Sequence, residues 1–176
     1  MTTTRSPGRL ADLVADVTQV VTAHPRGGVA TGGAVAEALA PYLGAEGLLT
    51  SEQCKGDASC YRQHLLYVAD DGAFSVVALV WLPGQVTPIH DHLCWCVVGV
   101  HQGREHETRY RVDGDRLTET ETLVNPSGST SVVVPPGDIH RVRNAGADVA
   151  ISLHVYGADL RIHGTSIRRE YDLPVG

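Results

Sequence analysis

The sequence predicts a mainly β domain, built as a sandwich or small barrel, with N-terminal helices packed against its outside. Apolar residues recur at helical spacing before about residue 50, and short β-prone runs separated by turn residues follow from residue 60 to residue 157. With 176 residues, 43% of them apolar, the chain is long enough for one sizeable core. We find no internal repeat or linker, and we expect a single domain over 1–176 with a helical segment at 1–50, a barrel core at 60–157 and a tail at 158–176.

The first segment is predicted to hold two helices. Ser6 and Pro7 suit a helix N-cap followed by proline in the first turn. Apolar side chains then recur at helical spacing at Leu10, Leu13, Val14, Val17 and Val21. A second helix, ending at Gly44, is marked by Val35, Leu39 and Tyr42 or Leu43. The glycine-rich stretches "HPRGG" and "TGG" are expected to separate the two helices.

Seven β-prone runs follow the helical segment. In order they are "YRQHLLYV", "AFSVVALVWL", "CVVGV", "ETRYRV", "RLTETETLV", "TSVVVP" and "VAISLHVYG". The stretch "RYRVDGDRLTE" predicts a hairpin around Asp113 and Gly114, and "NPSGS" predicts another turn. Many short strands at this spacing favour a sandwich or a small barrel.

Composition excludes several functional classes. A formal net charge of −6 argues against nucleic acid or an anionic membrane as a partner. The longest apolar run, 74–82, is far shorter than the roughly 18 residues of a membrane span, and the polar start "MTTTRSPGRL" has no hydrophobic signal core. The cysteines at 54, 60, 94 and 96 form no Cys-x-x-Cys pair. We therefore expect a cytoplasmic protein whose thiols stay free.

Two histidines stand out in "PIHDHLCWC". On a strand, His90 and His92 point to the same side, into the barrel, while Asp91 points away. A third ligand must come from elsewhere, and the best candidate is His140 in "VVVPPGDIHRVRN", where a Pro-Pro-Gly turn precedes a strand. An isolated His-x-His pair is more often a surface or hydrogen-bonded pair, so the metal-site hypothesis depends on its context.

That context resembles the cupin superfamily over about residues 60 to 157. The first cupin motif is Gly, five residues, His-x-His, three or four residues, Glu, six residues, Gly, and here it is matched except that Cys96 replaces Glu. The second motif is Gly, five residues, Pro-x-Gly, two residues, His, three residues, Asn. It is matched, with one extra residue after the first glycine, by Gly128, Pro135, Gly137, His140 and Asn144. The resemblance implies a double-stranded β-helix, or jelly-roll barrel.

The missing glutamate is the informative departure. Three neutral imidazoles without a carboxylate leave a divalent ion its full charge and, if it is octahedral, about three open positions. Such a centre attracts anions, and a thiol with a free pKa of roughly 8.5 would lose its proton on coordination. Imidazole ligands alone do not choose among zinc, copper, nickel and iron.

The three-histidine cupins that bind thiolates are the thiol dioxygenases. The segments "WLPGQVTPIHDHLCWCVVGV" and "ISLHVYG" resemble the most distinctive segments of cysteine dioxygenase and 3-mercaptopropionate dioxygenase. The resemblance implies one mononuclear Fe(II) per chain, which binds the thiolate and then O2 and delivers both oxygen atoms to sulfur to give a sulfinate. No external reductant is required, because sulfur supplies the electrons.

Ser152, His154 and Tyr156 alternate along one predicted strand and therefore share a face. In the family, the same Ser-x-His-x-Tyr series is a hydrogen-bond relay that presents the tyrosine hydroxyl to the iron site. We carry that catalytic role to these three residues. The alternative is a polar barrel interior whose buried groups need partners whether or not they catalyse anything.

Cys96 stands where vertebrate cysteine dioxygenases carry a cysteine that cross-links to the tyrosine, and where most bacterial members carry glycine. The resemblance thus raises a Cys96–Tyr156 thioether as one interpretation. A small buried thiol that fills core space is the other. Cys94 shares the face of Cys96 if the strand has no bulge, and spacing does not separate the two.

Substrate choice depends on "CYRQHLLY". The resemblance puts Tyr61 and Gln63 where cysteine-selective enzymes have Tyr and an Arg that grips the substrate carboxylate, and glutamine there is typical of the 3-mercaptopropionate type. Glutamine offers one neutral donor group where arginine offers a charged fork. Arg168 or Arg169 could supply the missing charge if the tail folds back over the pocket, although such arginines more often lie on a solvated surface.

The sequence predicts a thiol dioxygenase with O2 and a small thiol carboxylate, 3-mercaptopropionate or L-cysteine, as its partners. Two hypotheses from other classes stay open: a non-oxidative cupin enzyme that uses its metal as a Lewis acid, and a ligand-binding module. A variant of the first is a relative recruited to specialised metabolism that oxidises L-cysteine to another sulfur product.

Overall fold

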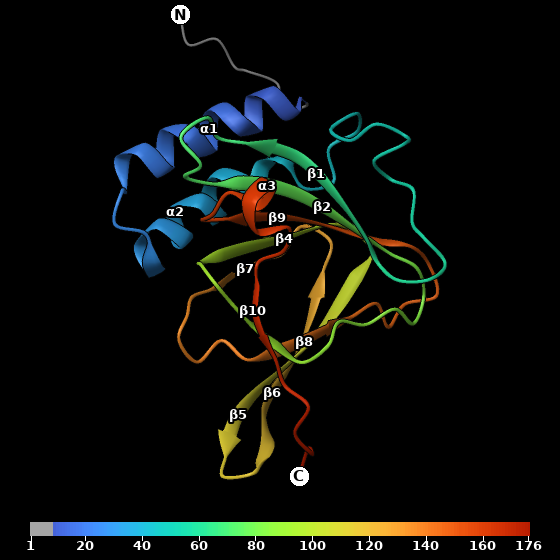
Figure 1. Cartoon of the computed structure of the whole chain (residues 1–176). Helices are drawn as coiled ribbons and strands as arrows, with labels where there is room; N and C mark the ends of the chain where they lie inside the picture. The colour runs from blue at the N-terminus through green and yellow to red at the C-terminus, as the bar shows by residue number, and fades with distance from the viewer. Residues whose placement is uncertain (1–8) are drawn as a thin grey trace, which may run out of the picture.

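The strands of the chain form two antiparallel sheets of five strands each, with two helices packed outside (Figure 1). The structure, a computed structural model, describes residues 9–176. Its helices are α1 (Leu10–Ala23), α2 (Gly28–Leu39), the 3-10 helix η1 (Ala40–Tyr42) and α3 (Leu160–His163). Its strands are β1 (Arg62–Val68), β2 (Ser75–Trp81), β3 (His90–His92), β4 (Cys96–Gln102), β5 (Arg104–Asp113), β6 (Arg116–Pro126), β7 (Thr130–Val133), β8 (His140–Arg143), β9 (Ala150–Tyr156) and β10 (Ile167–Glu170).

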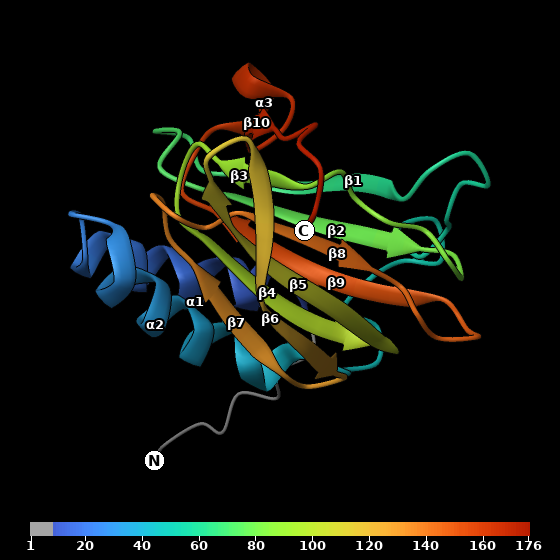
Figure 2. The same ribbon diagram turned by 90° about the horizontal axis from the view of Figure 1, so that it is seen from below.

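The first sheet has the order β1-β2-β9-β4-β7 and the second the order β10-β3-β8-β5-β6. Figure 2 shows α1 and α2 lying against the outer face of the first sheet, while the second sheet covers its inner face. The predicted fold class is confirmed: the chain is mainly β and cupin-like, with N-terminal helices outside the barrel. The longest hairpin, β5 with β6, projects at one end of the molecule (Figure 1).

Strand β9 has one face toward the helices and one face toward the barrel interior. Ile151, Leu153 and Val155 pack in one buried cluster with the helix residues Leu13 and Leu39. The alternate residues of β9 point into the barrel, where Tyr156 belongs to a second buried cluster. Each large aliphatic side chain that is fully buried in this way contributes about 1.5–3 kcal/mol to folding. Because side chains alternate along β9, one face of the strand packs against the helices and the other face lines the barrel interior, where a site can form.

The helical segment differs from the prediction in two respects. The second helix was expected to end at Gly44, but α2 ends at Leu39 and is followed by η1, which ends at Tyr42. The predicted break at "TGG" lies inside α2, where a Cβ atom on Gly32 would stand only 2.4 Å from Cγ1 of Val132. The glycine therefore allows the helix to approach β7 closely and does not mark the end of a helix. The two helices are separated at 24–27 instead, near "HPRGG" as expected. The predicted N-cap at Ser6 and Pro7 lies outside the described residues.

The β region follows the prediction closely, and the tail adds to it. The β5–β6 hairpin turns between Asp113 and Arg116, and a turn at "NPSGS" precedes β7. The tail at 158–176, for which no regular element was predicted, carries α3 and β10, and β10 pairs with β3 at the edge of the second sheet. None of the helices in the described part of the chain is both long and apolar enough to span a membrane.

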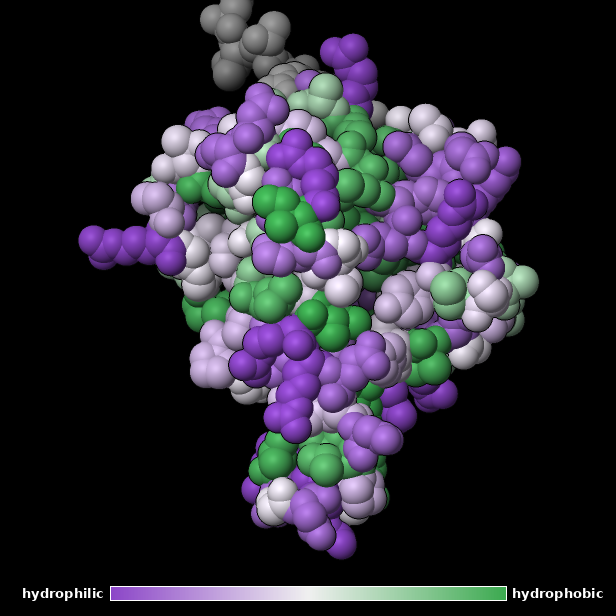
Figure 3. All heavy atoms as spheres, viewed as in Figure 1, coloured by the Kyte–Doolittle hydropathy of each residue, from purple (hydrophilic) through white to green (hydrophobic). Residues whose placement is uncertain are grey.

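On the face shown in Figure 3, apolar side chains form small separate groups among polar ones. The large hydrophobic residues that are exposed lie on different elements: Val29, Leu65, Val86, Leu93, Val112, Val124, Ile162 and Val175. Single exposed apolar side chains of this kind are normal for a protein surface.

Candidate metal centre

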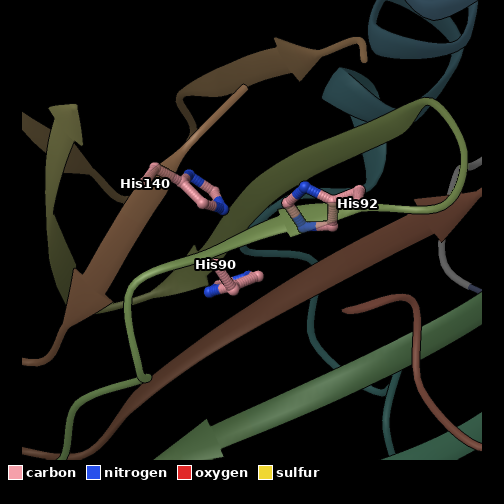
Figure 4. A group of neighbouring side chains, drawn as sticks. All are labelled: His90, His92 and His140. Atoms are coloured by element: carbon pink, nitrogen blue, oxygen red, sulfur yellow. The ribbon is translucent and has the colours of Figure 1, made fainter. Parts of the chain in front are cut away.

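Two neighbouring strands of the second sheet bring three histidines together inside the barrel. His90 and His92 stand two residues apart on β3, and His140 on β8 is the cross-strand partner of His90. Their ligand nitrogens all lie within 4.8 Å of one another, and the three residues are 5%, 3% and 4% exposed. Figure 4 shows the three rings turned toward a common point. The group can hold a single metal ion.

The arrangement of the rings is nearly symmetric. Their centroids are 4.9 Å apart for His90 and His92, 4.8 Å for His90 and His140, and 5.0 Å for His92 and His140. Three imidazoles on one side of an ion leave the opposite side open to substrates. Within the described residues, no carboxylate belongs to this group.

Each ring is held from behind through its Nδ1 atom. Nδ1 of His90 lies 2.9 Å from the carbonyl oxygen of Pro88, that of His92 lies 2.9 Å from Oδ2 of Asp138, and that of His140 lies 3.0 Å from Oε1 of Glu107. A carbonyl or an ionised carboxylate can only accept, so each Nδ1 must donate its hydrogen. The three Nε2 atoms are therefore the ones left for a metal.

Burial keeps His90 and His92 neutral, and hydrogen bonds keep Glu107 ionised, as a metal site needs. Burial, together with the neighbouring His140, lowers the pKa of His90 to about 3, and burial also lowers the pKa of His92. Burial alone would raise the pKa of Glu107, but hydrogen bonds and charge from His140 and Arg109 outweigh it and bring this pKa to about 2. Neutral imidazoles backed by an ionised carboxylate are a favourable ligand set for a divalent cation.

Asp138 and Glu107 change the charge balance expected from the sequence. The ligands themselves are neutral, as predicted, but two carboxylates stand directly behind two of them. The negative charges of these two carboxylates would therefore partly balance the charge of a bound dication. Neither residue was predicted, because only the fold brings Glu107 of β5 behind a histidine of β8.

A small cavity of about 30 Å³ opens beside the three histidines. Its apolar walls include Leu79, Trp81, Val98, Val142 and Ile167. Its polar wall includes Tyr61, Gln63, Thr87, His154, Tyr156, Thr165 and Ser166. The wall contains no lysine or arginine among the described residues that line it. The cavity thus admits a small ligand and meets it with neutral groups.

The predicted relay residues form a continuous hydrogen-bonded chain beside this cavity. Ser152 Oγ lies 2.9 Å from Nε2 of His154, and the Tyr156 hydroxyl lies 3.0 Å from Nδ1 of the same ring. Burial lowers the pKa of His154 to about 3 and raises the pKa of Tyr156 well above its ordinary value, so both stay uncharged. The centroid of the Tyr156 ring lies 6.3 Å from that of His92, so the tyrosine ring stands beside the histidine group.

Two of the predicted substrate-binding residues line the cavity. Tyr61 stacks on Trp81 with 4.6 Å between ring centroids. Gln63 donates from Nε2 to the carbonyl oxygen of Gly164 at 3.2 Å. This hydrogen bond ties strand β1 to the tail, so the tail does fold back over the site.

Arg168, the third predicted substrate-binding residue, has a different position. Its guanidinium binds Asp91, whose carboxylate also accepts a hydrogen bond of 2.8 Å from the Tyr171 hydroxyl. Ile167, its neighbour, faces the cavity, so alternation along β10 turns Arg168 outward toward the buried Asp91. Arg169 stands over the ring of Tyr171 and does not line the cavity either. The structure therefore differs from the expectation that an arginine of the tail supplies charge to the pocket.

Cys96 and Tyr156 are direct cross-strand partners on β4 and β9. Cys96 is 1% exposed, its Sγ lies 3.9 Å from Nδ1 of His154, and burial raises its pKa well above the usual thiol value. Cys94 is only partly buried, and burial raises its pKa to about 11. The two cysteines, which spacing alone could not separate, thus differ in that Cys96 has Tyr156 as its partner in the sheet.

Comparison with known proteins gives one match to a family. The family described as "Cysteine dioxygenase type I" matches residues 2–163. Similar solved structures include TT1209 from Thermus thermophilus, with 20% identity over 63% of this chain and 96% of that chain and a TM-score of 0.47. An rmlc-like cupin protein from Desulfovibrio desulfuricans has 21% identity over 61% and 92%, with a TM-score of 0.46. A cupin 2 conserved barrel domain protein from Salinispora arenicola has 19% identity over 66% and 90%, with a TM-score of 0.47.

Proposed function

Because this chain belongs to the cysteine dioxygenase type I family, we propose that it is a thiol dioxygenase that converts a small thiol and O2 into a sulfinate. The observation that carries the proposal is the buried group of three histidines, which includes no carboxylate ligand among the described residues. The Nδ1 atoms of these residues are held by acceptors, so their Nε2 atoms fit one Fe(II) per chain. His90, His92 and His140 would hold it.

Iron, when bound, supplies the place where a thiolate and O2 meet and exchange electrons. The overall reaction is balanced without a further reductant, because a thiolate and O2 together contain all the atoms of the sulfinate and the sulfur gives up the four electrons that the two oxygen atoms take. The protein does not need a strong general base, since coordination lowers the pKa of the thiol. This agrees with a cavity wall built from neutral groups.

The side chains around the cavity would position the reactants. Tyr156 lines the cavity with its ring 6.3 Å from that of His92, and its hydroxyl, kept protonated by burial, would orient an oxygen or sulfur ligand by a hydrogen bond. Ser152 and His154 hold that tyrosine through bonds of 2.9 and 3.0 Å. The apolar walls formed by Leu79, Trp81 and Val98 would keep water from competing with the substrate.

We propose 3-mercaptopropionate ahead of L-cysteine as substrate. Gln63 stands on the cavity wall where an arginine would grip a carboxylate, and Arg168 is engaged by Asp91. The substrate carboxylate would therefore meet neutral donors, including the Gln63 amide, the Tyr61 hydroxyl and the hydroxyl of Ser166. A neutral set of this kind selects less strongly for a carboxylate than a guanidinium does.

The proposal is tested by anaerobic reconstitution with Fe(II), followed by O2 uptake and product mass with 3-mercaptopropionate, L-cysteine, cysteamine and mercaptosuccinate. We expect a product that has gained two oxygen atoms, with 3-mercaptopropionate giving the highest kcat/KM. The His140→Ala variant should lose turnover and bound iron together. Activity with zinc in the absence of O2 uptake would instead support a Lewis-acid enzyme.

The Gln63→Arg variant tests the substrate assignment separately from the reaction. An arginine at this position should shift relative kcat/KM toward L-cysteine, because it restores a charged partner for the carboxylate. An unchanged ratio of the kcat/KM values for the two substrates would show that Gln63 does not select the substrate. It would not contradict the proposed reaction.

We infer that the partners of this chain are small molecules, O2 and a thiol, and that it works in the cytoplasm. All four cysteines are free thiols, including the exposed Cys60. Free thiols persist in a reducing compartment. Fractionation of cells that express the chain, with the thiol state of Cys60 measured by alkylation, tests this location.

A further inference from the structure

The C-terminal segment, residues 164–176, runs along β3 and then on to β6. It follows α3, pairs with β3 through β10 and continues toward the β5–β6 hairpin (Figure 1). There Leu117 of β6 donates a backbone hydrogen bond of 2.8 Å to Pro174, and Gly176 donates one of 2.9 Å to Leu117. The segment lies beyond residues 2–163, which the family matches, so the match assigns it no role.

Strand β3, which carries two of the three ligand histidines, has its longer pairing with this segment. The strand has three residues, and its pairing with β8 consists of one residue pair, His90 with His140. On its other side, β10 pairs with all three of its residues. Just beyond the end of β3, the amide of Leu93 donates to the carbonyl oxygen of Ser166 at 2.8 Å. The position of β3 therefore depends on the C-terminal segment as well as on β8.

Asp91 lies between the two histidines of β3 and points to the opposite side of the strand. Its side chain is only 1% exposed. Nε of Arg168 donates to Oδ1 at 3.2 Å, a second nitrogen of the same guanidinium binds Oδ2, and the Tyr171 hydroxyl donates to Oδ2 at 2.8 Å. All of these hydrogen bonds come from the C-terminal segment. A buried carboxylate is costly without such partners, because water does not reach it.

Apolar side chains of the same segment cover two further neighbours of the ligands. Ile89 and Ile139, which precede the first and the third ligand histidine, are buried in one small cluster. Tyr171 and Leu173 pack against this cluster, and the amide of Tyr171 donates to the carbonyl oxygen of Ile89 at 2.8 Å. The C-terminal segment thus supports the chain from outside next to each of the three ligands.

The spacing of the ligands decides how well they bind a metal. An ion is bound only by molecules in which all three histidines are in place, so the apparent affinity falls with the fraction of molecules in that arrangement. Without the C-terminal segment, Asp91 would lose its partners and β3 its longer pairing. The two histidines of β3 would then move relative to His140, and the metal would bind more weakly.

We propose that the C-terminal segment is part of the metal centre: by binding Asp91 through Arg168 and Tyr171, it holds β3 so that its two histidines meet His140 at one ion. Arg168 and Tyr171 are positioning residues. Docking of the segment and binding of the metal strengthen each other, because coupling between two sites is reciprocal. The inference rests on the metal binding that the proposed function requires, and not on turnover of a thiol.

The zinc(II) affinity of the full chain, measured by competition with a chromophoric chelator, tests the proposal without any assay of activity. Arg168→Met should lower the affinity by about fivefold or more, the lower end of typical couplings between sites. Tyr171→Phe, which removes one hydroxyl, should lower it less. Arg168→Lys, which keeps the charge, should lose less affinity than Arg168→Met. Affinities of the folded Arg168→Met and Tyr171→Phe variants equal to that of the wild type would overturn the proposal.

Two controls separate positioning from a general loss of stability. Arg161→Met removes an arginine that binds Asp159 at 2.7 Å in the same tail, and it should leave the zinc affinity unchanged. Leu13→Ala opens a cavity in the cluster beneath the helices, so it should lower the midpoint of unfolding and leave the affinity of the folded protein unchanged. A Leu13→Ala variant that binds zinc as weakly as Arg168→Met would show that affinity only follows stability, and this would contradict the proposal.

The reciprocal effect is measured in the wild type alone. Saturation with zinc(II) should slow hydrogen exchange of the amides of Tyr171 and Leu117, which form hydrogen bonds of the C-terminal segment, by about fivefold or more. The amide of Ala73, which donates to Asp71 in the turn between β1 and β2, should not change. Unchanged exchange of Tyr171 and Leu117 would overturn the coupling.

The same measurements distinguish this inference from the proposed function. A wild type that binds no zinc would refute the metal centre, and this inference with it. Zinc binding that depends on Arg168, in a protein that turns over no thiol with Fe(II), would support the inference and contradict only the proposed function.

Discussion

Oε1 of Glu107 lies 3.0 Å from Nδ1 of His140. Through this contact, strand β5 supports one of the three histidines of the metal centre. Arg109 in turn binds the same carboxylate oxygen of Glu107 at 3.0 Å. The third histidine is therefore oriented by residues that no motif around it contains. Substitution of such a supporting residue distinguishes a built site from histidines that only happen to be close.

Glu107→Gln should weaken metal binding by about 10- to 100-fold, since removing a carboxylate behind a metal-bound histidine typically has an effect of this size. The amide keeps the shape of the side chain but loses the charge that favours the imidazole as a ligand. Competition of zinc(II) between the protein and a chromophoric chelator measures the affinity. Glu119→Gln, at an exposed position of β6, is the matched control, and equal affinities of the two variants would show that Glu107 has no such role.

Arg168→Met should lower the midpoint of thermal unfolding and leave the KM for 3-mercaptopropionate within about twofold of the wild-type value. The reason is that Arg168 binds the buried Asp91 on the outer side of β3 and does not line the cavity. Thermal denaturation and steady-state kinetics measure the two effects. A KM raised tenfold or more, with an unchanged midpoint of unfolding, would show that Arg168 binds the substrate.

Glu105→Gln should make the protein more stable than the wild type at alkaline pH. The pKa of Glu105 is about 7 in the folded chain against 4.5 for the free side chain, so the folded state holds its proton more tightly. The wild type therefore has the full contribution of this group below about pH 4.5 and loses about 3 kcal/mol as the pH rises through 7. Urea unfolding of the metal-free proteins at several pH values measures this difference, which should be absent if the carboxyl group is ionised throughout.

A feature of the structure could be predicted where the residues that determine it lie in one short segment of the sequence. The alternation of Ile151, Leu153 and Val155 with Ser152, His154 and Tyr156 is contained in one segment, so the orientation of β9 could be predicted. The spacing of His90 and His92 and the turn before His140 are equally local. The helical "TGG" was misjudged because the reason for Gly32 is a neighbour a hundred residues away, Val132.

The supporting groups of the site could not be predicted for the same reason. Glu107 and Asp138 are ordinary acidic residues in their own segments, and only the pairing of β5 with β8 and the turn before β8 bring them behind the site. The position of Arg168 depends on the pairing of β10 with β3, whose register shifts between Ile167 and Arg169. A short strand with mixed polarity has no pattern that reveals such a partner.

Cys96 and Tyr156 should form a thioether after turnover with Fe(II), O2 and thiol. Their position as cross-strand partners in the buried sheet brings the two side chains to the same place. Formation of the bond removes two hydrogens, so the intact mass of the wild type should fall by that amount, while the mass of Cys96→Ala should not change. A wild-type mass that stays constant through many turnovers would leave Cys96 as a buried thiol that fills space.

The most direct test of the central claim is turnover of 3-mercaptopropionate under O2 labelled with oxygen-18, followed by mass analysis of the product. A metal centre of three neutral histidines that joins a thiolate to O2 predicts a sulfinate in which both added oxygens carry the label. A product with one labelled oxygen, or a product without any, would contradict the account.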